Sequence, residues 1–110
     1  MANITNPATA ILKVAKAVIE DPKHWIQGDF AKDSSGISVS ARYSHAVCFC
    51  ALGALRSVVA HKDIHRPYIY LCEAANNLGY NSIPEANDEG GHAEVMGMYD
   101  VAIKLSEEAA

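Results

Sequence analysis

The sequence predicts a mainly α fold, a compact four-helix domain, because three features of the chain agree. Four stretches carry apolar residues at helical spacing, with charged residues on their other sides. Proline opens two of these stretches, and glycine or an Asp-Pro pair closes two, as expected of helix ends. A chain of 110 residues has the usual size of one domain, so we expect residues 1–110 to form a single domain around one core.

The first helix is expected to begin at Pro7. Asn6 can cap the free amides of its first turn, and proline suits the first helical position, where a missing N–H costs nothing. Apolar residues then follow at helical spacing: Ala8, Ile11, Leu12, Ala15, Val18 and Ile19. The helix should end at Asp21, because the residue before Pro22 avoids the α region.

The segment from Lys23 to Ser44 is the least helical part of the sequence. Residues 33–36 are Asp-Ser-Ser-Gly, which favour a turn. Residues 27–32 and 37–41 flank this turn and could pair as a small β-hairpin. An isolated hairpin is only marginally stable, so it would have to lie on the helices.

The second helix is predicted from about Ser44 to Ala60. Residues 46–55 are apolar on every side, which is typical of a central helix covered by others. Gly53 lies inside this helix although glycine costs roughly 1 kcal/mol there relative to alanine. We therefore expect Gly53 to allow the close approach of a neighbouring helix.

Two further helices complete the predicted domain. The third runs from Pro67 to Gly79 and the last from about His92 to Glu108, each with one apolar stripe. Residues 80–91 lie between them and are rich in acidic residues, asparagine and glycine. This composition predicts a second long loop.

Charge and cysteine content exclude several classes of protein. The formal net charge is −4 and the nine lysines and arginines are scattered, so nucleic-acid binding is not expected, although a local basic patch could still exist. The longest apolar run is about half the length that spans a bilayer, so we expect no membrane insertion. Three cysteines, an odd number, follow an N-terminus without a signal-peptide pattern, which predicts reduced thiols in the cytoplasm.

Three short motifs resemble a family of small uncharacterised bacterial and phage proteins, a domain of unknown function. The motifs are Trp-Ile-Gln-Gly at residues 25–28, Cys-Ala-Leu-Gly-Ala-Leu at 50–55, and Asn-Asp at 87–88 before an amphipathic helix. The similarity extends from Trp25 to Leu105. The family pattern has tryptophan before Asn-Asp, where this sequence has Ala86. The resemblance implies the helical layout but no activity.

Cys50 admits an enzymatic interpretation. A helix N-terminus lowers the pKa of a thiol, and His92 and Asp88 could serve as base and orienting group in a small hydrolase or transferase. The alternative is an inert core cysteine, because Cys48 and Cys50 both lie in an apolar run, where cysteine is usually a buried hydrophobe. A reactive thiol of low pKa would distinguish the two.

A metal site is the weaker hypothesis for the same cysteines. Cys48 and Cys50 are followed by His61 and His65, which superficially resembles a zinc pattern. On a helix, sulfurs two residues apart point about 200° away from each other, so they cannot share one ion unless the helix begins after Cys50. We expect no metal, and no motif indicates a cofactor.

The leading hypothesis is therefore a non-enzymatic protein-binding or regulatory module, encoded by a phage or mobile element. Both irregular segments carry side chains that the core does not need, and loops on a rigid scaffold usually perform recognition. We expect the two segments to lie side by side as one partly acidic surface that binds a basic protein partner. Its expected residues are Trp25, Gln27, Asp33, Glu85, Asn87, Asp88 and His92. The aromatic residues Trp25, Phe30 and Tyr43 either close the edge of the core or form part of that surface.

Overall fold

The computed structural model describes residues 6–109, and within them it contains four α-helices and a two-stranded antiparallel sheet. The predicted mainly α fold with a small hairpin is therefore confirmed. The helices are α1 (Pro7–Val18), α2 (Ala51–Val58), α3 (His65–Asn77) and α4 (Ile83–Glu108). The strands are β1 (Ala31–Asp33) and β2 (Ala46–Phe49), and two 3-10 turns are η1 (Pro22–His24) and η2 (His61–Asp63).

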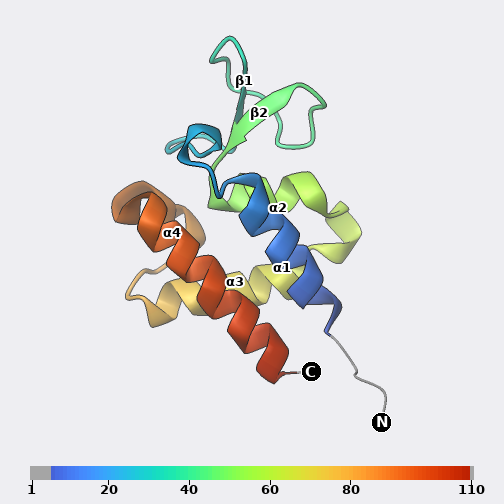
Figure 1. Ribbon diagram of the computed structural model, residues 1–110, viewed down its shortest axis with the longest axis vertical. Helices are drawn as coiled ribbons and strands as arrows, with labels where there is room; N and C mark the ends of the chain where they lie inside the picture. Colours follow the sequence, from blue (N-terminus) through green and yellow to red (C-terminus); the bar gives the residue numbers. More distant parts are fainter. Residues whose placement is uncertain (1–5, 110) are drawn as a thin grey trace.

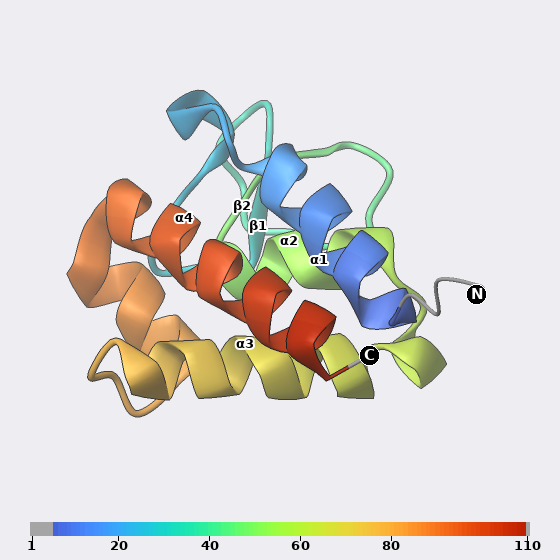
Figure 2. The ribbon, with the colours of Figure 1, turned by 60° about the horizontal axis from the view of Figure 1, so that its bottom comes forward.

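The core lies between the four helices. α4 packs on α3 and α1, and α1 also packs on α2. Figures 1 and 2 show α4 crossing α3, with the sheet at the end of the molecule away from α3. Leu12, Leu55 and Leu71 are fully buried. Tyr99 is also fully buried, and its hydroxyl donates to the carbonyl of Ala51 at 2.6 Å, which joins α4 to the start of α2.

The first helix agrees with the sequence. The side chain of Asn6 accepts from the amide of Ala8 at 3.0 Å, as an N-cap should. The same side chain donates to the hydroxyl of Tyr70 at 2.9 Å and to the carbonyl of Ser106 at 3.2 Å. Asn6 therefore also fixes the start of α1 to α3 and to the end of α4.

The predicted helix over residues 44–60 is wrong in its first part. Residues 46–49 form β2, and α2 begins at Ala51. Along β2 the side chain of Val47 is exposed and that of Phe49 is buried, and both residue types favour strands. A short apolar run cannot be assigned to a helix or a strand by spacing alone, and here pairing with β1 decides the outcome.

The hairpin also has a different second strand from the expected one. β1 pairs antiparallel with β2, with Ala31 opposite Phe49 and Lys32 opposite Cys48. The expected partner, residues 37–41, contributes a single isolated bridge between Lys32 and Ser38. The expected turn at residues 33–36 does form, with the amide of Gly36 donating to the carbonyl of Asp33 at 3.0 Å, and the chain then continues through a loop to β2.

Gly53 does allow a close approach, but the neighbour is a backbone carbonyl before β1 and not a helix. A Cβ atom at Gly53 would lie 1.9 Å from the carbonyl oxygen of Phe30. That oxygen accepts a hydrogen bond from the amide of Cys50 at 3.2 Å. Glycine at position 53 therefore lets the chain before β1 bond to the residue that caps α2.

The predicted loop at residues 80–91 is also wrong, because α4 begins at Ile83. Ser82 caps it: the amide of Glu85 donates to the Ser82 hydroxyl at 3.2 Å, and the Glu85 carboxylate accepts from the amide of Asn81 at 3.0 Å. The spacing Ser-x-x-Glu is a helix-start pattern. Gly91 kinks the helix, with φ 81° and ψ 175°, so it interrupts α4 rather than preceding it.

The remaining boundaries lie close to expectation. α3 starts two residues before Pro67 and ends before Gly79, whose φ of 95° favours glycine. Within residues 6–109, no helix combines the length and the apolar character that crossing a membrane requires.

Candidate functional site

Asn87 is the centre of a polar network that joins three parts of the chain. Although it lies on α4, it is only 1% exposed. Its Oδ1 accepts from Trp25 Nε1 at 2.7 Å and from the amide of Ala51 at 2.8 Å. Its Nδ2 donates to the carbonyl of Ile26 at 3.0 Å and to Asp88 Oδ1 at 3.1 Å. The side chain thus makes all four hydrogen bonds of which an amide is capable.

The next two residues after Ile26 extend this network. Gln27 Nε2 donates to the carbonyls of Asn87 and Asp88 at 3.1 and 3.0 Å, and the amide of Gly28 donates to Asp88 Oδ1 at 3.0 Å. We call this set the Asn87 network: Trp25, Ile26, Gln27, Gly28, Ala51, Asn87 and Asp88. It places the expected recognition residues Trp25 and Gln27 beside Asn87 and Asp88.

In the Asn87 network these residues form hydrogen bonds with one another. Among the described residues, no buried side-chain nitrogen or oxygen lacks a hydrogen-bond partner. Because the Asn87 amide is buried and fully bonded, its polar atoms are not available to a partner. The geometry therefore favours a positioning role for Asn87: it holds the chain from Trp25 to Gly28 against α2 and α4.

His92 contacts the Asn87 network through Trp25. Its Nε2 lies 2.7 Å from the carbonyl oxygen of Ile19, at the end of α1. A carbonyl can only accept, so Nε2 carries the hydrogen of this bond. The imidazole also contacts the Trp25 ring edge-on, with centroids 5.5 Å apart. His92 thus joins α4 to α1 and to Trp25.

The structure does not bring Asp33 and Glu85 into this site. Asp33 Oδ1 accepts from the amides of Ser35 and Ile37 and shapes the turn after β1. Glu85 caps the start of α4, as described above. The spacing from Ser82 to Glu85 is the sequence signal that could have identified this capping role.

The three motifs that carry the family resemblance meet at the Asn87 network. Residues 25–28 and 87–88 supply most of its hydrogen bonds, and the motif at 50–55 supplies the amide of Ala51 and the close approach at Gly53. Ala86, where the resemblance leads us to expect tryptophan, is fully buried. In this chain that position therefore belongs to the core.

Cys50 lies beside the network, at the edge of a small cleft of about 180 Å³ that Asp29 and Pro84 also line. It is the N-cap of α2, and its Sγ accepts from the amide of Gly53 at 3.2 Å. Burial raises the pKa of the Cys50 thiol, and the lowering effect of the Gly53 and Leu52 amides is smaller. Among the described residues, no hydrogen bond joins His92 to Cys50.

We expect the Cys50 thiol to react slowly in the native protein. Because its pKa is raised, the thiol stays protonated at about pH 8, where an exposed cysteine is partly thiolate. A Cys48→Ser, Cys72→Ser variant leaves one thiol to follow with a chromogenic disulfide reagent. The rate should rise steeply with pH and on denaturation. Rapid native reaction near pH ~6 would contradict this and favour the enzymatic interpretation.

The cysteines and histidines of the metal hypothesis lie on separate elements. Cys48 is in β2, Cys50 caps α2, and His61 and His65 lie in η2 and α3. Within residues 6–109, no cluster of three or more histidine, cysteine or carboxylate side chains could hold a metal ion.

A second feature of this end of the molecule is apolar exposure. We call residues 29–49 the hairpin segment; it projects from the helical body beyond α2 (Figure 1). Four of its large apolar side chains are exposed: Phe30 44%, Ile37 60%, Tyr43 48% and Val47 40%. The sequence drew attention to Phe30 and Tyr43. Ile37 and Val47 were missed because they were assigned to a hairpin strand and to a buried helix.

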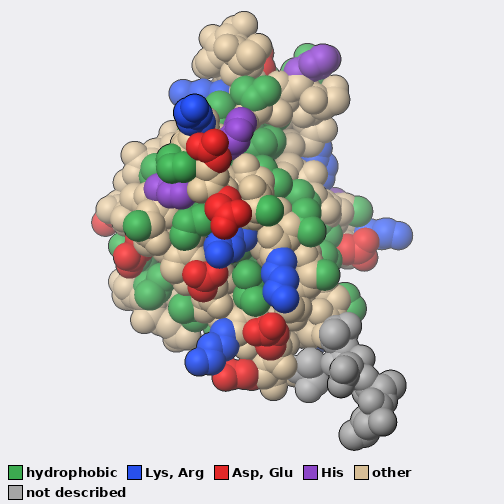
Figure 3. Space-filling view, in the orientation of Figure 1, with side chains coloured by type: hydrophobic (Ala, Val, Ile, Leu, Met, Phe, Trp, Pro, Cys, Tyr) green, Lys and Arg blue, Asp and Glu red, His purple; other side chains and the backbone are tan. Residues whose placement is uncertain are grey.

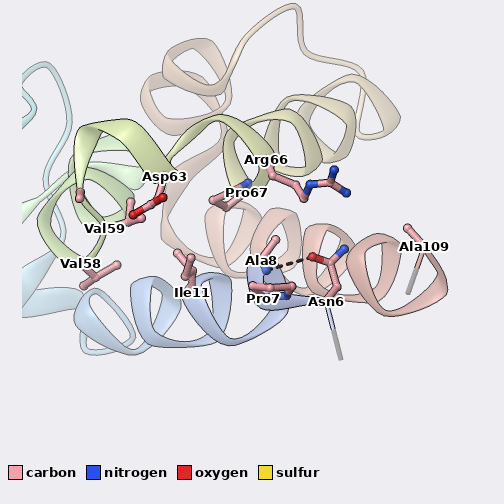
Figure 4. Close-up of a pocket in the computed structure, with 11 residues that line it drawn as sticks. Asn6, Pro7, Ala8, Ile11, Val58, Val59, Asp63, Arg66, Pro67 and Ala109 are labelled. Carbon is pink, nitrogen blue, oxygen red and sulfur yellow. Dashed lines mark hydrogen bonds between the residues drawn. The ribbon is translucent and has the colours of Figure 1, made fainter. Parts of the chain in front are cut away.

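A larger hollow lies elsewhere, between the starts of α1 and α3 and the end of α2 (Figure 4). Its volume is about 750 Å³ and its walls include Ile11, Val58 and Val59. Asp63 and Arg66 are the charged residues among its lining residues. Figure 4 shows the Asn6 amide turned toward Ala8, to which it is bonded. The lining therefore offers no converging set of catalytic groups.

Comparison with known protein families gives a match over most of the chain. The model of a family described as a family of unknown function (DUF6197) matches residues 4–105. No curated protein and no solved structure matches the chain.

Proposed function

The chain belongs to the DUF6197 family of unknown function, and from its geometry we propose that it is a non-enzymatic protein-binding module. In this proposal the Asn87 network holds the hairpin segment on the helical body. The hairpin segment in turn contacts the partner.

The observation that carries the proposal is the apolar exposure of the hairpin segment. Exposed apolar side chains that are scattered singly are normal, but several on one projecting segment are typical of an interaction surface. Ile37 and Tyr43 are the two most exposed of the four. Tyrosine supplies a large apolar area and a polar group, which suits it to such surfaces.

The Asn87 network supports the proposal by fixing the segment before binding. A segment that is already ordered loses less conformational entropy when it binds. Trp25 and Gly28 precede β1 and are bonded to α4, and the amide of Ile26 donates to the carbonyl of Phe49 at 3.0 Å. Both ends of the hairpin segment are thus tied to the scaffold.

The contacts at Cys50 and His92 favour a non-catalytic role. A nucleophile needs a base within hydrogen-bond reach, and the His92 ring is instead engaged with Ile19 and Trp25. We further propose a cytoplasmic location, because Cys48, Cys50 and Cys72 are all free.

The test is affinity capture from a lysate of the source organism with wild-type protein and two variants. Ile37→Ser with Tyr43→Ser should lose the partner, because it removes exposed apolar area from the hairpin segment. The matched control is Val14→Ser on α1, where the native side chain is 53% exposed, and it should retain the partner. Thermal melts must show that both variants fold. Equal capture by wild type and the double variant would contradict the proposal.

A further inference from the structure

The positive charge of the chain is concentrated in one part of the sequence. Residues 40–72 contain four lysines or arginines, three histidines and a single aspartate. Residues 73–110 contain eight carboxylate side chains and one lysine. The net charge of −4 therefore conceals a separation of charge, and such local fields influence which partners associate.

Three of the five lysines outside residues 40–72 are in ion pairs. Over α1 and α4, basic and acidic side chains lie interspersed (Figure 3). Within residues 6–109 the ion pairs are Lys13–Glu107 at 3.9 Å, Lys16–Asp100 at 2.9 Å and Lys32–Asp29 at 3.9 Å. In the part of the chain that the structure describes, none of the four basic residues between 40 and 72 is in an ion pair. These residues are Arg42, Arg56, Lys62 and Arg66.

Arg56 connects this charge to the hairpin segment. Its guanidinium lies 4.4 Å from the centre of the exposed Phe30 ring, a cation–π contact that fixes its position. Arg56 also lines a hollow of about 350 Å³. Leu52 and Ile64 are its apolar lining residues, and His61, His65 and Tyr68 complete it with Arg56.

Neighbouring hollows continue the same face. Arg42 and Arg56 line one of them, and the Arg42 guanidinium donates to the carbonyl of Val59 at 3.3 Å. His65 and Arg66 line another together with the exposed Ile69 and one carboxylate, Glu73. We call this surface the basic face: Phe30, Arg42, Arg56, His61, His65, Arg66 and Tyr68.

Building on the proposed protein-binding function, we infer that the basic face receives an acidic segment of the partner protein. That segment would place carboxylates against Arg42, Arg56 and Arg66 and an apolar or aromatic side chain in the hollow beside Arg56. Arginine forks match carboxylates in geometry. The carboxylates of the partner would also provide the opposite charges with which these arginines are not paired in their own chain.

The same observations favour an acidic protein segment over a nucleic acid. The fixed cations are few and alternate with exposed apolar side chains such as Phe30 and Tyr68. The eight carboxylates of residues 73–110 would repel a long polyanion that extended beyond the basic face. A short segment that alternates acidic and apolar residues fits both kinds of side chain.

The test uses a random copolymer of glutamate and tyrosine as the probe, followed by fluorescence anisotropy. Wild-type protein should bind it, and binding should weaken as salt rises. Arg56→Glu with Arg66→Glu should weaken binding by roughly tenfold or more, because two attractive contacts become repulsive. The matched control, Lys23→Glu with Lys104→Glu, makes the same change of net charge on η1 and α4 and should bind like wild type.

Thermal melts of both variants accompany these measurements, since Arg56 contacts Phe30. If Arg56→Glu unfolds the protein, Arg42→Glu with Arg66→Glu replaces it, because both side chains are exposed. Equal binding of the probe by the folded arginine variant and by wild type would overturn the inference. Tighter binding of a lysine–tyrosine copolymer, or equally tight binding of single-stranded DNA, would also overturn it.

Capture from lysate separates this inference from the function on which it rests. In one outcome the arginine variant retains the cellular partner while Ile37→Ser with Tyr43→Ser loses it. That result supports the proposed protein-binding function and contradicts the inference that the partner offers an acidic segment to the basic face. If both variants lose the partner, the protein-binding function and the inference of an acidic segment are both supported. If neither variant changes capture, the protein-binding proposal itself fails.

Discussion

Asn87→Ala should lower the free energy of unfolding by about 3 kcal/mol, because it leaves buried donors without acceptors. The amide of Ala51 and the indole Nε1 of Trp25 both donate to Asn87 Oδ1. The carbonyl of Ile26 and the carboxylate of Asp88 lose a donor in the same change. Chemical denaturation followed by the fluorescence of the single tryptophan measures this loss.

Asn77→Ala is the matched control, because it makes the same substitution at an exposed position at the end of α3. Its effect should stay within about 0.5 kcal/mol, as for most surface changes. If the two variants were equally stable, the Asn87 side chain would not hold the chain before β1. In that case Asn87 would again be a candidate for contact with a partner.

Gly53→Ala should also be strongly destabilising, by about 2–3 kcal/mol, although alanine is the better helix former. The new Cβ would lie 1.9 Å from the Phe30 carbonyl oxygen, so the backbone of one of the two segments must move. That movement would weaken the hydrogen bond from the Cys50 amide to Phe30. Denaturant melts give the change in free energy.

Gly97→Ala provides the opposite control in the same fold. Gly97 lies within α4, and a Cβ there would have no neighbour within 4 Å. Its replacement should therefore raise stability by up to about 1 kcal/mol through helix propensity. Opposite signs for the two substitutions would support the close approach at Gly53, and a stabilising Gly53→Ala would refute it.

The sequence predicted the helices well wherever local chemistry determined them. Asn6 and Pro7 specify the start of α1, and Gly79 specifies the end of α3, through capping and backbone preferences that need no tertiary contact. The start of α4 was predictable on the same grounds from Ser82 and Glu85. Asparagine and glycine are abundant in that stretch and favour a loop, so the composition and the capping pattern point to different structures.

The strand β2 could not be predicted in this way. Its apolar residues suit a buried helix as well as a strand, and only pairing with β1 distinguishes the two. The approach of Phe30 to Gly53 is likewise a contact between distant residues. Glycine at position 53 indicated a close neighbour, but nothing in its local sequence identified that neighbour.

The sequence predicted which residues lie together in the candidate site better than it predicted what they do there. Trp25, Gln27, Asn87 and Asp88 were expected to lie together, and their hydrogen bonds join them. They were expected to face a partner, because polar residues in presumed loops suggest recognition. The burial of Asn87 follows from the helical start of α4, which turns this residue inward.

The exchange rate of the Trp25 indole hydrogen tests the central claim most directly. Trp25 is the only tryptophan, so its indole gives one resonance that needs no further assignment. A bond of 2.7 Å to the buried Asn87 predicts an indole hydrogen protected from solvent in the wild type and exposed in folded Asn87→Ala. An indole that exchanges in the wild type as fast as free tryptophan would contradict the claim that the Asn87 network holds the hairpin segment.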